Sequence, residues 1–553
     1  MSTPEPLMNR GEVARAAGVA AQAVSNWMRR HPDFPQLVRR GSREGYPASE
    51  VAAWLDSRHI PRPSLRKREH QGVTYGDRFR SAVGIPAPPA VSDTTGMQVE
   101  DPLDERLWAP LERLLRKSEV PAVFEAVVLS LLCLRETSPV GWSATSRASV
   151  ETIHEIVMQA WHRQPERMMA ATRVVRDVPA TVYARHQLVE IVRILSTDRA
   201  PAAQVFEYLL DRFAKYRHSS PDEYLIPTEL AGLMVRMLDP APGSRIHDPC
   251  CGPGNLLVAA GKYMSRVTRS GSPVTLTGRA ATVRTWSLAM MNAAIHRMQV
   301  DLGDGPPSYP AEIDADPGLF DVVLLNPPFG MRNWSRPASR SLRPWPYGEP
   351  SAHNVTWAWL QTAVEALVPD GRAAVVMPYS ATSARTARER EIRKAMVERG
   401  AVRCIVALPS HLFRETTVPV TVWILAHPSN NASSEILFID ARAAARRISP
   451  THRVLTERGC HLVLDAFHGW VNGTVAFPSS TDEFAATTAT VAEIQEHVYD
   501  LQPVTYLNQR GRVGPAPQTP PQLRALRADL ARLDDAARIA DLTLDRCLAK
   551  LVT

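Results

Sequence analysis

Residues 245–257 read RIHDPCCGPGNLL, and this stretch decides the fold that the sequence predicts. A short strand is predicted to end at Asp248, and Gly252 and Gly254 then predict a tight turn into a helix. Glycines at such a turn let the backbone approach a ligand, and ligands of open α/β sheets bind at the carboxyl ends of the strands. No Lys-Ser or Lys-Thr pair follows the glycines, as it would in a phosphate-binding loop. The acid and the turn together suit a ligand that carries an ammonium group and a ribose.

A second stretch reads FDVVLLNPPFG and predicts a strand that ends in Asn326, Pro327, Pro328 and Phe329 at the same sheet edge. An aromatic amine is a poor nucleophile because its lone pair is delocalised into the ring. The amide oxygen of Asn326 and the carbonyl of Pro327 can each accept one amine hydrogen, and the consecutive prolines fix the backbone that carries these acceptors. Phe329 offers a face on which a flipped base can stack. The four residues therefore predict a catalytic centre for amine methylation rather than an ordinary Asn-Pro turn.

Strand-like apolar runs alternate with helical segments from about residue 222 onward. The runs lie at 275–276, 321–325, 372–377, 403–408 and 420–425. Alternation of this kind predicts an α/β fold with a mostly parallel sheet and helices on both faces.

The chain from about residue 107 to its end resembles the modification (HsdM-like) subunits of type I restriction-modification systems, the N6-adenine DNA methylase family. The resemblance rests on the two motifs above and on four later blocks, PYGEP at 346–350, AWLQ at 358–361, DGRAAVVMP at 370–378 and LPSHLF at 408–413. It implies a Rossmann-like methyltransferase domain, S-adenosylmethionine as cofactor, double-stranded DNA as substrate, and a part in restriction or phage defence. The later blocks separate the chain from protein-glutamine and RNA methylases, which share only the Asn-Pro-Pro core.

Carried over residue by residue, the resemblance implies a cofactor pocket formed by Tyr224, Pro227, Thr228, Asp248, Gly252, Gly254, Asn255, Leu256 and Asp304. Two positions depart from the family pattern. Ile226 stands where the family has threonine, and Ala280 stands where it has a glutamate that grips the ribose hydroxyls. A missing charged acceptor is expected to weaken cofactor binding by about 1–3 kcal/mol.

The first 60 residues predict a small winged helix-turn-helix. A helix over residues 9–17 is stopped by Gly18, and a second helix follows over about 20–30, with Val13, Ala17, Val19, Val24 and Trp27 sharing a small core. The second helix presents amides and guanidiniums suited to DNA, namely Gln22, Ser25, Asn26, Arg29 and Arg30. This unit resembles the MerR and excisionase-like families, whose folds also serve as protein-docking modules.

The remaining segments complete the predicted organisation. A linker is expected over 61–100, a helical domain over 101–200, the methyltransferase domain over 201–445 and a C-terminal extension over 446–515. Residues 516–553 carry a heptad of mainly leucines and predict a helix that pairs within the chain or with a partner. By the resemblance, this helix meets a sequence-reading specificity subunit, and a second copy of the chain is the other partner considered.

Composition narrows the class of protein. Of the 64 Lys and Arg residues 14 lie in residues 1–80, against 8 Asp and Glu, so this segment holds +6 of the net charge of +7 and suits nucleic acid. The six cysteines show no zinc-site spacing and predict reduced thiols and no metal site. No apolar run approaches the roughly 18 residues of a membrane span, and no signal peptide is apparent, which predicts a cytoplasmic protein without membrane contact.

Two functions remain open at this stage. The first is an active adenine-N6 methyltransferase that forms the modification subunit of such a system. The alternative is a methylase-fold protein that has lost efficient cofactor capture, as Ala280 suggests, and acts as a DNA-binding or scaffold component.

Overall fold

The structure is a computed structural model, and it divides the chain into two compact units, Met1–Asp104 and Glu105–Thr553. The residues that it describes are 7–30, 34–35, 37–40, 43–55, 58, 74–83, 105–118, 121–165, 168, 181–198, 200–217, 225–268, 274–303, 317–329, 334, 344–351, 354–383, 386–413, 416–428, 434–449, 452–475, 477, 479–481 and 483–510. Among the helices of these ranges, none is both long and apolar enough to cross a membrane.

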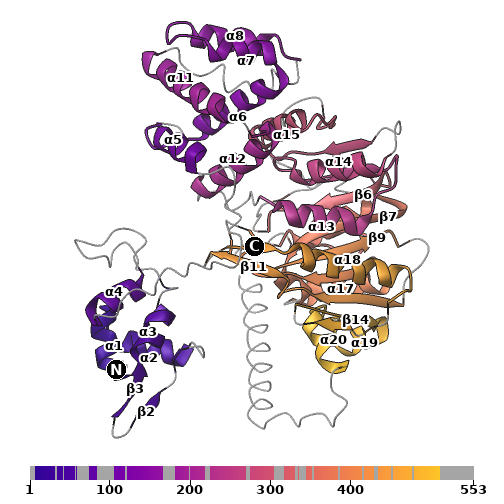
Figure 1. Cartoon of the computed structure of the whole chain (residues 1–553). Coiled ribbons are helices and arrows are strands. Elements are labelled where there is room, and N and C mark those ends of the chain that lie inside the picture. Colours follow the sequence, from indigo (N-terminus) through magenta and orange to yellow (C-terminus); the bar gives the residue numbers. More distant parts are fainter. Residues whose placement is uncertain are drawn as a thin grey trace, which may run out of the picture. The chain divides into compact units, whose positions relative to one another are not determined.

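The described residues of the first unit form four helices and a three-stranded antiparallel sheet (Figure 1). The helices are α1 (Arg10–Ala17), α2 (Ala21–Arg30), α3 (Ala48–Leu55) and α4 (Tyr75–Val83), and the strands, in the order β1-β3-β2, are β1 (Leu7–Met8), β3 (Arg43–Pro47) and β2 (Val38–Arg40). Asn9 caps α1 by accepting a hydrogen bond from the backbone N–H of Glu12, whose carboxylate bonds back to Asn9. Gly18 ends α1 in the left-handed region at φ 67°.

The prediction of a linker over 61–100 is wrong in part, because residues Tyr75–Val83 form helix α4. Its Phe79 is completely buried in the core formed by α1, α2 and α3, and the guanidinium of Arg78 donates to the carbonyl of Ala17. The charged and polar residues of this segment gave no sign of a helix, and its contribution to the core is Phe79 together with the partly buried Tyr75 and Val83. The first unit therefore extends at least to Val83.

The second unit begins with helices that lie against one another. These are α5 (Glu105–Leu115), α6 (Pro121–Thr137), α7 (Pro139–Ser146), α8 (Ile153–His162), α11 (Val182–Thr197) and α12 (Ala202–Arg217). Helix α6 is the central one, because it packs against α7, α11 and α12 and is buried along the run from Val127 to Leu134. The helical region thus continues past the predicted boundary at residue 200 to include α12.

A nine-stranded mixed sheet follows, in the order β13-β14-β10-β8-β9-β7-β6-β4-β5. Its strands are β4 (Arg245–Asp248), β5 (Thr275–Gly278), β6 (Phe320–Leu325), β7 (Leu367–Pro378), β8 (Val402–Ala407), β9 (Val420–Ala426), β10 (Glu435–Asp440), β13 (Ser479–Thr481) and β14 (Phe484–Thr490). Strands β4, β5, β6 and β7 pair in parallel, whereas β9 lies antiparallel between β7 and β8. The expected α/β fold is therefore confirmed, but the expectation of a mostly parallel sheet is wrong, because β9, β13 and β14 make four of the eight strand pairs antiparallel.

Helices cover both faces of this sheet (Figure 1). One face packs under α13 (Thr228–Leu238), α14 (Asn255–Val267) and α18 (Glu457–Val471), and the other under α16 (Thr356–Glu365), α17 (Ala387–Glu398), α19 (Val491–Glu496) and α20 (Pro503–Arg510). Alternate strand residues supply the two cores: Val322 faces the first and Val323 the second. Helix α15 (Val283–Ile295), the short 3₁₀ turn Tyr379–Thr382, and a hairpin of β11 (Ala445–Ser449) and β12 (His452–Leu455) complete the unit.

The predicted boundary of the methyltransferase domain at residue 445 needs correction. Strand β14 pairs with β10 over six residue pairs, from Glu435 opposite Thr490 to Asp440 opposite Ala485, and β13 adds to β14. The C-terminal extension predicted over 446–515 is thus part of the same sheet as far as Thr490. The heptad-patterned helix over 516–553 lies outside the described residues.

Charged pairs attach the helical region to α14 and α15. Arg284 of α15 pairs with the buried Glu125 of α6 at 2.8 Å. Glu207 of α12 accepts from Lys262 of α14 at 2.5 Å and lies 3.1 Å from Nε2 of His296. Burial opposes ionisation of Glu207, but its bonds to His296 and Lys262 outweigh burial and hold the pKa of this carboxyl below its usual range.

Candidate cofactor and catalytic site

The Gly-rich turn after β4 is held by hydrogen bonds within the backbone and to the side chain of Asp248. The N–H of Cys250 donates to the carboxyl of Asp248 at 3.1 Å, and the N–H of Gly254 donates to the carbonyl of Cys251 at 2.7 Å. Arg279, just after β5, accepts from the N–H of Cys251 and donates its own N–H to the carbonyl of Asp248, both at 2.9 Å. The turn is therefore fixed to the neighbouring strand end.

Two glycines are required by the conformation of this turn. Gly252 has φ 50° and Gly254 has φ 83°, in the left-handed region that favours glycine. A Cβ on Gly254 would also lie 3.3 Å from the Cβ of Ala289 on α15, whereas a Cβ on Gly252 would point into open space. Gly254 is thus constrained by packing, and Gly252 leaves the backbone accessible to a ligand.

The parallel pairing of β4 with β6 brings the two sequence motifs to one sheet edge. Ile246 lies opposite Val322 and His247 opposite Val323, so Asn326 follows about two residues beyond the level of Asp248. Asn326 is half-buried and its Oδ1 is shielded from solvent, while Pro327 and Pro328 are buried. Phe329 is half-buried against the core under α13 and α14.

Asp248 is the most strongly perturbed carboxyl among the described residues. Its side chain is 1% exposed, and burial raises its pKa to about 8, although the hydrogen bond from Cys250 acts in the opposite direction. The carboxyl is therefore mostly protonated at pH 7. A cation bound beside it would favour the ionised form and release a proton.

The two departures from the family pattern differ in their surroundings. Ile226 is buried in the core under α13, where an apolar side chain packs well. Ala280 is half-buried beside the Gly-rich turn, against a small cluster that includes Cys251 and Trp286. Ala280 directly follows Arg279, whose backbone is hydrogen-bonded to Cys251 and Asp248 at the turn.

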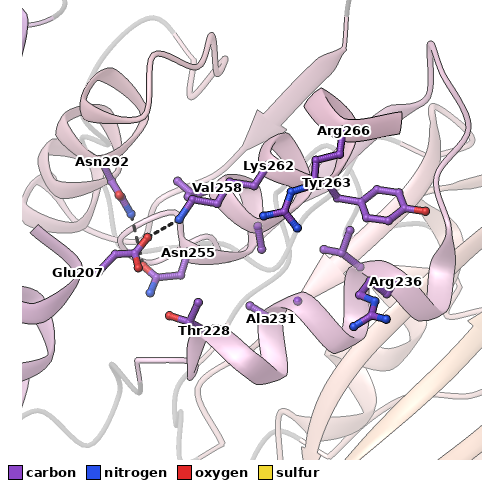
Figure 2. Close-up of a pocket in the computed structure, with 13 residues that line it drawn as sticks. Glu207, Thr228, Ala231, Arg236, Asn255, Val258, Lys262, Tyr263, Arg266 and Asn292 are labelled. Atoms are coloured by element: carbon purple, nitrogen blue, oxygen red, sulfur yellow. Dashed lines mark hydrogen bonds and ion pairs between the residues drawn. The ribbon is translucent and has the colours of Figure 1, made fainter. Parts of the chain in front are cut away.

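A pocket of about 180 Å³ lies between α13 and α14 (Figure 2). Thr228 and Asn255, two of the predicted cofactor residues, line it together with Asn292 and Glu207. Arg236, Tyr263 and Arg266 line its other end, and small apolar residues of the two helices form the middle. The pocket thus shares the first residues of α13 and α14 with the predicted cofactor site.

Three of the predicted cofactor residues do not present a described side chain to the site. Tyr224 and Asp304 lie outside the described residues. The side chain of Leu256 is 2% exposed and packs in the core, so that residue presents only its backbone to a ligand. Asn292 also lies beside the turn, and the only sign of it in the sequence is that it is a lone polar residue within an apolar run of α15. Among the residues that the structure describes, no group of three or more His, Cys, Asp or Glu side chains could hold a metal ion.

Comparison with known families and proteins gives a consistent set of matches. A family model described as N-6 DNA methylase matches residues 198–512. The type I restriction enzyme HindI methylase subunit of Haemophilus influenzae is 31% identical over 308 residues, which make up 55% of this chain and 67% of that subunit. The MjaIX methylase subunit of Methanocaldococcus jannaschii is 29% identical over 314 residues, 55% of each chain.

Solved structures agree at the level of the fold. The methyltransferase subunit of a type I restriction-modification system from Streptococcus thermophilus superposes with a TM-score of 0.59 at 20% identity, over 74% of this chain and 99% of that one. A second type I restriction-modification structure gives a TM-score of 0.53 at 17% identity, over 81% and 99% of the two chains.

Replacing Asp248 with asparagine is expected to make the protein more stable at neutral and alkaline pH. Because the folded carboxyl has the higher pKa, its contribution to stability is complete below about pH 4 and is lost as pH rises toward 8. The Tm of Asp248→Asn should therefore exceed that of the wild type by an amount that grows up to about pH 8 and is constant above it. Each pKa unit that separates the folded and unfolded states is worth about 1.4 kcal/mol.

Asp321→Asn is the matched control, since its effect has the opposite sign. Asp321 lies at the other end of β6, and the hydrogen bonds and charge of Arg245 lower its pKa. This substitution should lower the Tm above about pH 4. The loss in free energy of unfolding should be less than about 1 kcal/mol, because the pair is partly exposed, and it should fade at lower pH. An Asp248→Asn effect that does not vary between pH 5 and 9 would contradict the assignment.

Proposed function

The chain belongs to the N-6 DNA methylase family, and from this premise we propose that it methylates the exocyclic N6 of adenine in double-stranded DNA, as the modification subunit of a restriction-modification or phage-defence system. The main observation in support is that the Asn-Pro-Pro-Phe segment and the Gly-rich turn lie at the same edge of the sheet. The matched relatives carry the name of type I methylase subunits.

The proposed chemistry depends on two hydrogen-bond acceptors. The Oδ1 of Asn326 and the carbonyl of Pro327 would each accept one hydrogen of the N6 amine, which shifts the lone pair of that nitrogen out of the ring. Pro327 and Pro328 are buried and have fixed φ angles, so the acceptors need little reorganisation when the base arrives. Phe329 would stack against a base that has been flipped out of the duplex, and its half-buried ring is already fixed by the core.

The residues at the Gly-rich turn fit S-adenosylmethionine. Asp248 presents a buried carboxyl that a cationic amino group would ionise, and Gly252 has no side chain to obstruct the approach of a ligand. Pro227, Thr228, Gly254, Asn255 and the backbone of Leu256 would complete the described part of the pocket, with Tyr224 and Asp304 as further contacts expected from the sequence. When bound, S-adenosylmethionine supplies a methyl group on a positively charged sulfur.

We further propose that sequence recognition depends on a partner. The chain from Asp248 to Asn326 holds α14, β5, α15 and β6, which leaves no room for a target-recognition domain between the two motifs. The helix expected over 516–553 is the proposed contact with a specificity-type subunit, and self-association through the same heptad is the alternative partner.

The first unit is proposed to be a winged helix-turn-helix that contacts DNA. Helices α1 and α2 meet at the Gly18 turn, and the hairpin of β2 and β3 follows them. Val13, Ala17 and Val24 are buried between the helices, which leaves Gln22 exposed on α2. The side chains of Asn26, Arg29 and Arg30 lie outside the described residues, so their proposed contacts rest on the sequence alone.

A second function is favoured by one residue, Ala280. If cofactor capture has been lost with the expected glutamate, the chain would act as a DNA-binding or scaffold protein with a methylase fold. Micromolar binding of S-adenosylmethionine in calorimetry would remove this alternative, and no detectable heat at millimolar cofactor would support it.

Asn326→Ala is expected to lower kcat for methyl transfer by about 100-fold or more, because it removes one preorganised acceptor of the reacting amine. Transfer of tritiated methyl groups to DNA, with the products of neighbouring genes present, measures this loss. Affinity for S-adenosylmethionine should remain within about twofold of the wild type, and Asn472→Ala, an exposed asparagine at the end of α18, should leave kcat unchanged. If the wild-type protein binds S-adenosylmethionine but methylates no DNA, the proposed activity is refuted.

Ala280→Glu is expected to strengthen binding of S-adenosylmethionine by about 5- to 100-fold, since it restores a charged acceptor worth about 1–3 kcal/mol. Isothermal calorimetry on the full chain measures this gain. Ala280→Gln has the same length but no charge and should give a smaller gain. An affinity that falls in both variants would show that position 280 does not face the ribose.

Arg29→Ala and Gln22→Ala are expected to affect DNA binding in different ways. If Arg29 contacts a phosphate, its loss should weaken binding to all sequences and reduce the slope of log K against log salt by about 1. If Gln22 contacts a base, its loss should weaken binding to the preferred sequence and leave the slope unchanged. Titration of the full chain with duplex DNA at several salt concentrations measures both quantities, and equal slopes in wild type and Arg29→Ala would contradict the phosphate contact.

A further inference from the structure

Helix α15 supports the Gly-rich turn from behind through two residues one turn apart. Ala289 lies against Gly254, where an added Cβ would come within 3.3 Å of its own Cβ. Asn292 is 1% exposed, and its Nδ2 donates to the carbonyl of Pro253 at 2.9 Å and reaches Oδ1 of Asn255 at 3.4 Å. The side chain of Asn292 thus contacts the residues on both sides of Gly254.

The orientation of the Asn292 amide follows from its partner. The carbonyl of Pro253 can only accept, so the amide must turn its NH₂ group toward it. Its Oδ1 is buried and has no hydrogen-bond partner among the described residues. A buried amide oxygen without a hydrogen-bond donor lowers the stability of the folded protein. Stabilisation of the fold is therefore not a sufficient reason for an asparagine at position 292.

We propose that Asn292 is a positioning residue that holds the Gly-rich turn in the conformation that binds cofactor. The inference rests on the proposed function, in which this turn binds S-adenosylmethionine. Gly252 and Gly254 give the turn access to its left-handed conformations but also allow it many others. The bond from Asn292 to Pro253, which lies between the two glycines, restricts that freedom before the ligand arrives.

The packing of α14 against α15 keeps Asn292 within reach of the turn. Glu207 of α12 pairs with Lys262, two turns after Asn255 on α14. It also lies beside His296, which directly follows α15 and stands four residues after Asn292. Figure 2 shows the Glu207–Lys262 pair and the contact of Asn292 with Asn255 side by side at one end of the pocket. The helical region thereby fixes the separation of the two helices that the positioning contact spans.

Asn292→Ala and Asn292→Leu both remove the NH₂ donor, and Asn292→Leu keeps about the size of the side chain. Each should weaken binding of S-adenosylmethionine about tenfold in calorimetry on the full chain, as expected for the loss of one hydrogen bond that orders the site. At saturating cofactor, kcat for DNA methylation should stay within about twofold of the wild type, because Asn292 contacts the turn and not the reacting amine. The effect should thus appear in the KM for cofactor.

A matched control separates positioning from general stability. Gln361 is also a fully buried amide that holds a turn, since it bonds to Tyr347 and Gly348, but that turn belongs to no predicted cofactor contact. Gln361→Ala should lower the Tm and leave the affinity for S-adenosylmethionine unchanged. Equal losses of affinity in the Asn292 and Gln361 variants would overturn the proposal.

Hydrogen exchange in the cofactor-free protein tests the inference independently of cofactor binding. Asn292→Ala should speed exchange of the amides of Cys251 and Gly254, which are hydrogen-bonded in the turn, and leave the strand amides of β6 unchanged. Unchanged exchange at the turn would overturn the positioning role. A wild type that binds no S-adenosylmethionine, but whose turn loosens in Asn292→Ala, would overturn the proposed function and leave the positioning contact established.

Discussion

Strand β4 pairs in parallel with β6, and the position of the candidate site depends on this register. Val322 packs into the core on one face of the sheet and Val323 into the core on the other, so a slip of one residue would place both side chains on the wrong face. Two independent cores therefore lock the register. Asp248 and Asn326 are held at one edge by that lock, although 78 residues separate them in the sequence.

The turn that follows β4 contains features that cost folding free energy. Gly252 and Gly254 lose much conformational freedom, and Asp248 is buried without a cationic partner among the described residues. Such costs are typical of sites that must receive a ligand, because a binding surface cannot be satisfied internally. The sheet and its helices supply the stability that allows this turn to persist.

The position of the candidate site could be predicted from the sequence because each of its two motifs is a short continuous stretch of the chain. Asp248 with its glycines and Asn326 with its prolines each lie within a few residues of a strand end, so the parallel sheet that the sequence predicts brings them together. Asn292 could not be placed in this way, because its contact with Pro253 spans 39 residues and depends on how α15 crosses the turn.

Other parts of the fold were missed because their local signal is weak. Strand β14 reads FAATTAT, and its alanines and threonines show little of the alternation that marks a half-buried strand. It is recognisable only from its partner, β10. Helix α4 has a single fully buried side chain, Phe79, within a charged and polar segment, so its packing is likewise a tertiary effect.

The order of strands in the sheet also has a consequence for synthesis of the chain. Strand β10 is complete at Asp440, but the strand that covers its free side begins only at Phe484. During translation the strands that carry the candidate site therefore leave the ribosome before one edge of their sheet has a partner. An unpaired edge is a template for association with other chains, so the interval between residues 440 and 484 is a stage at which a nascent chain is exposed to misassembly.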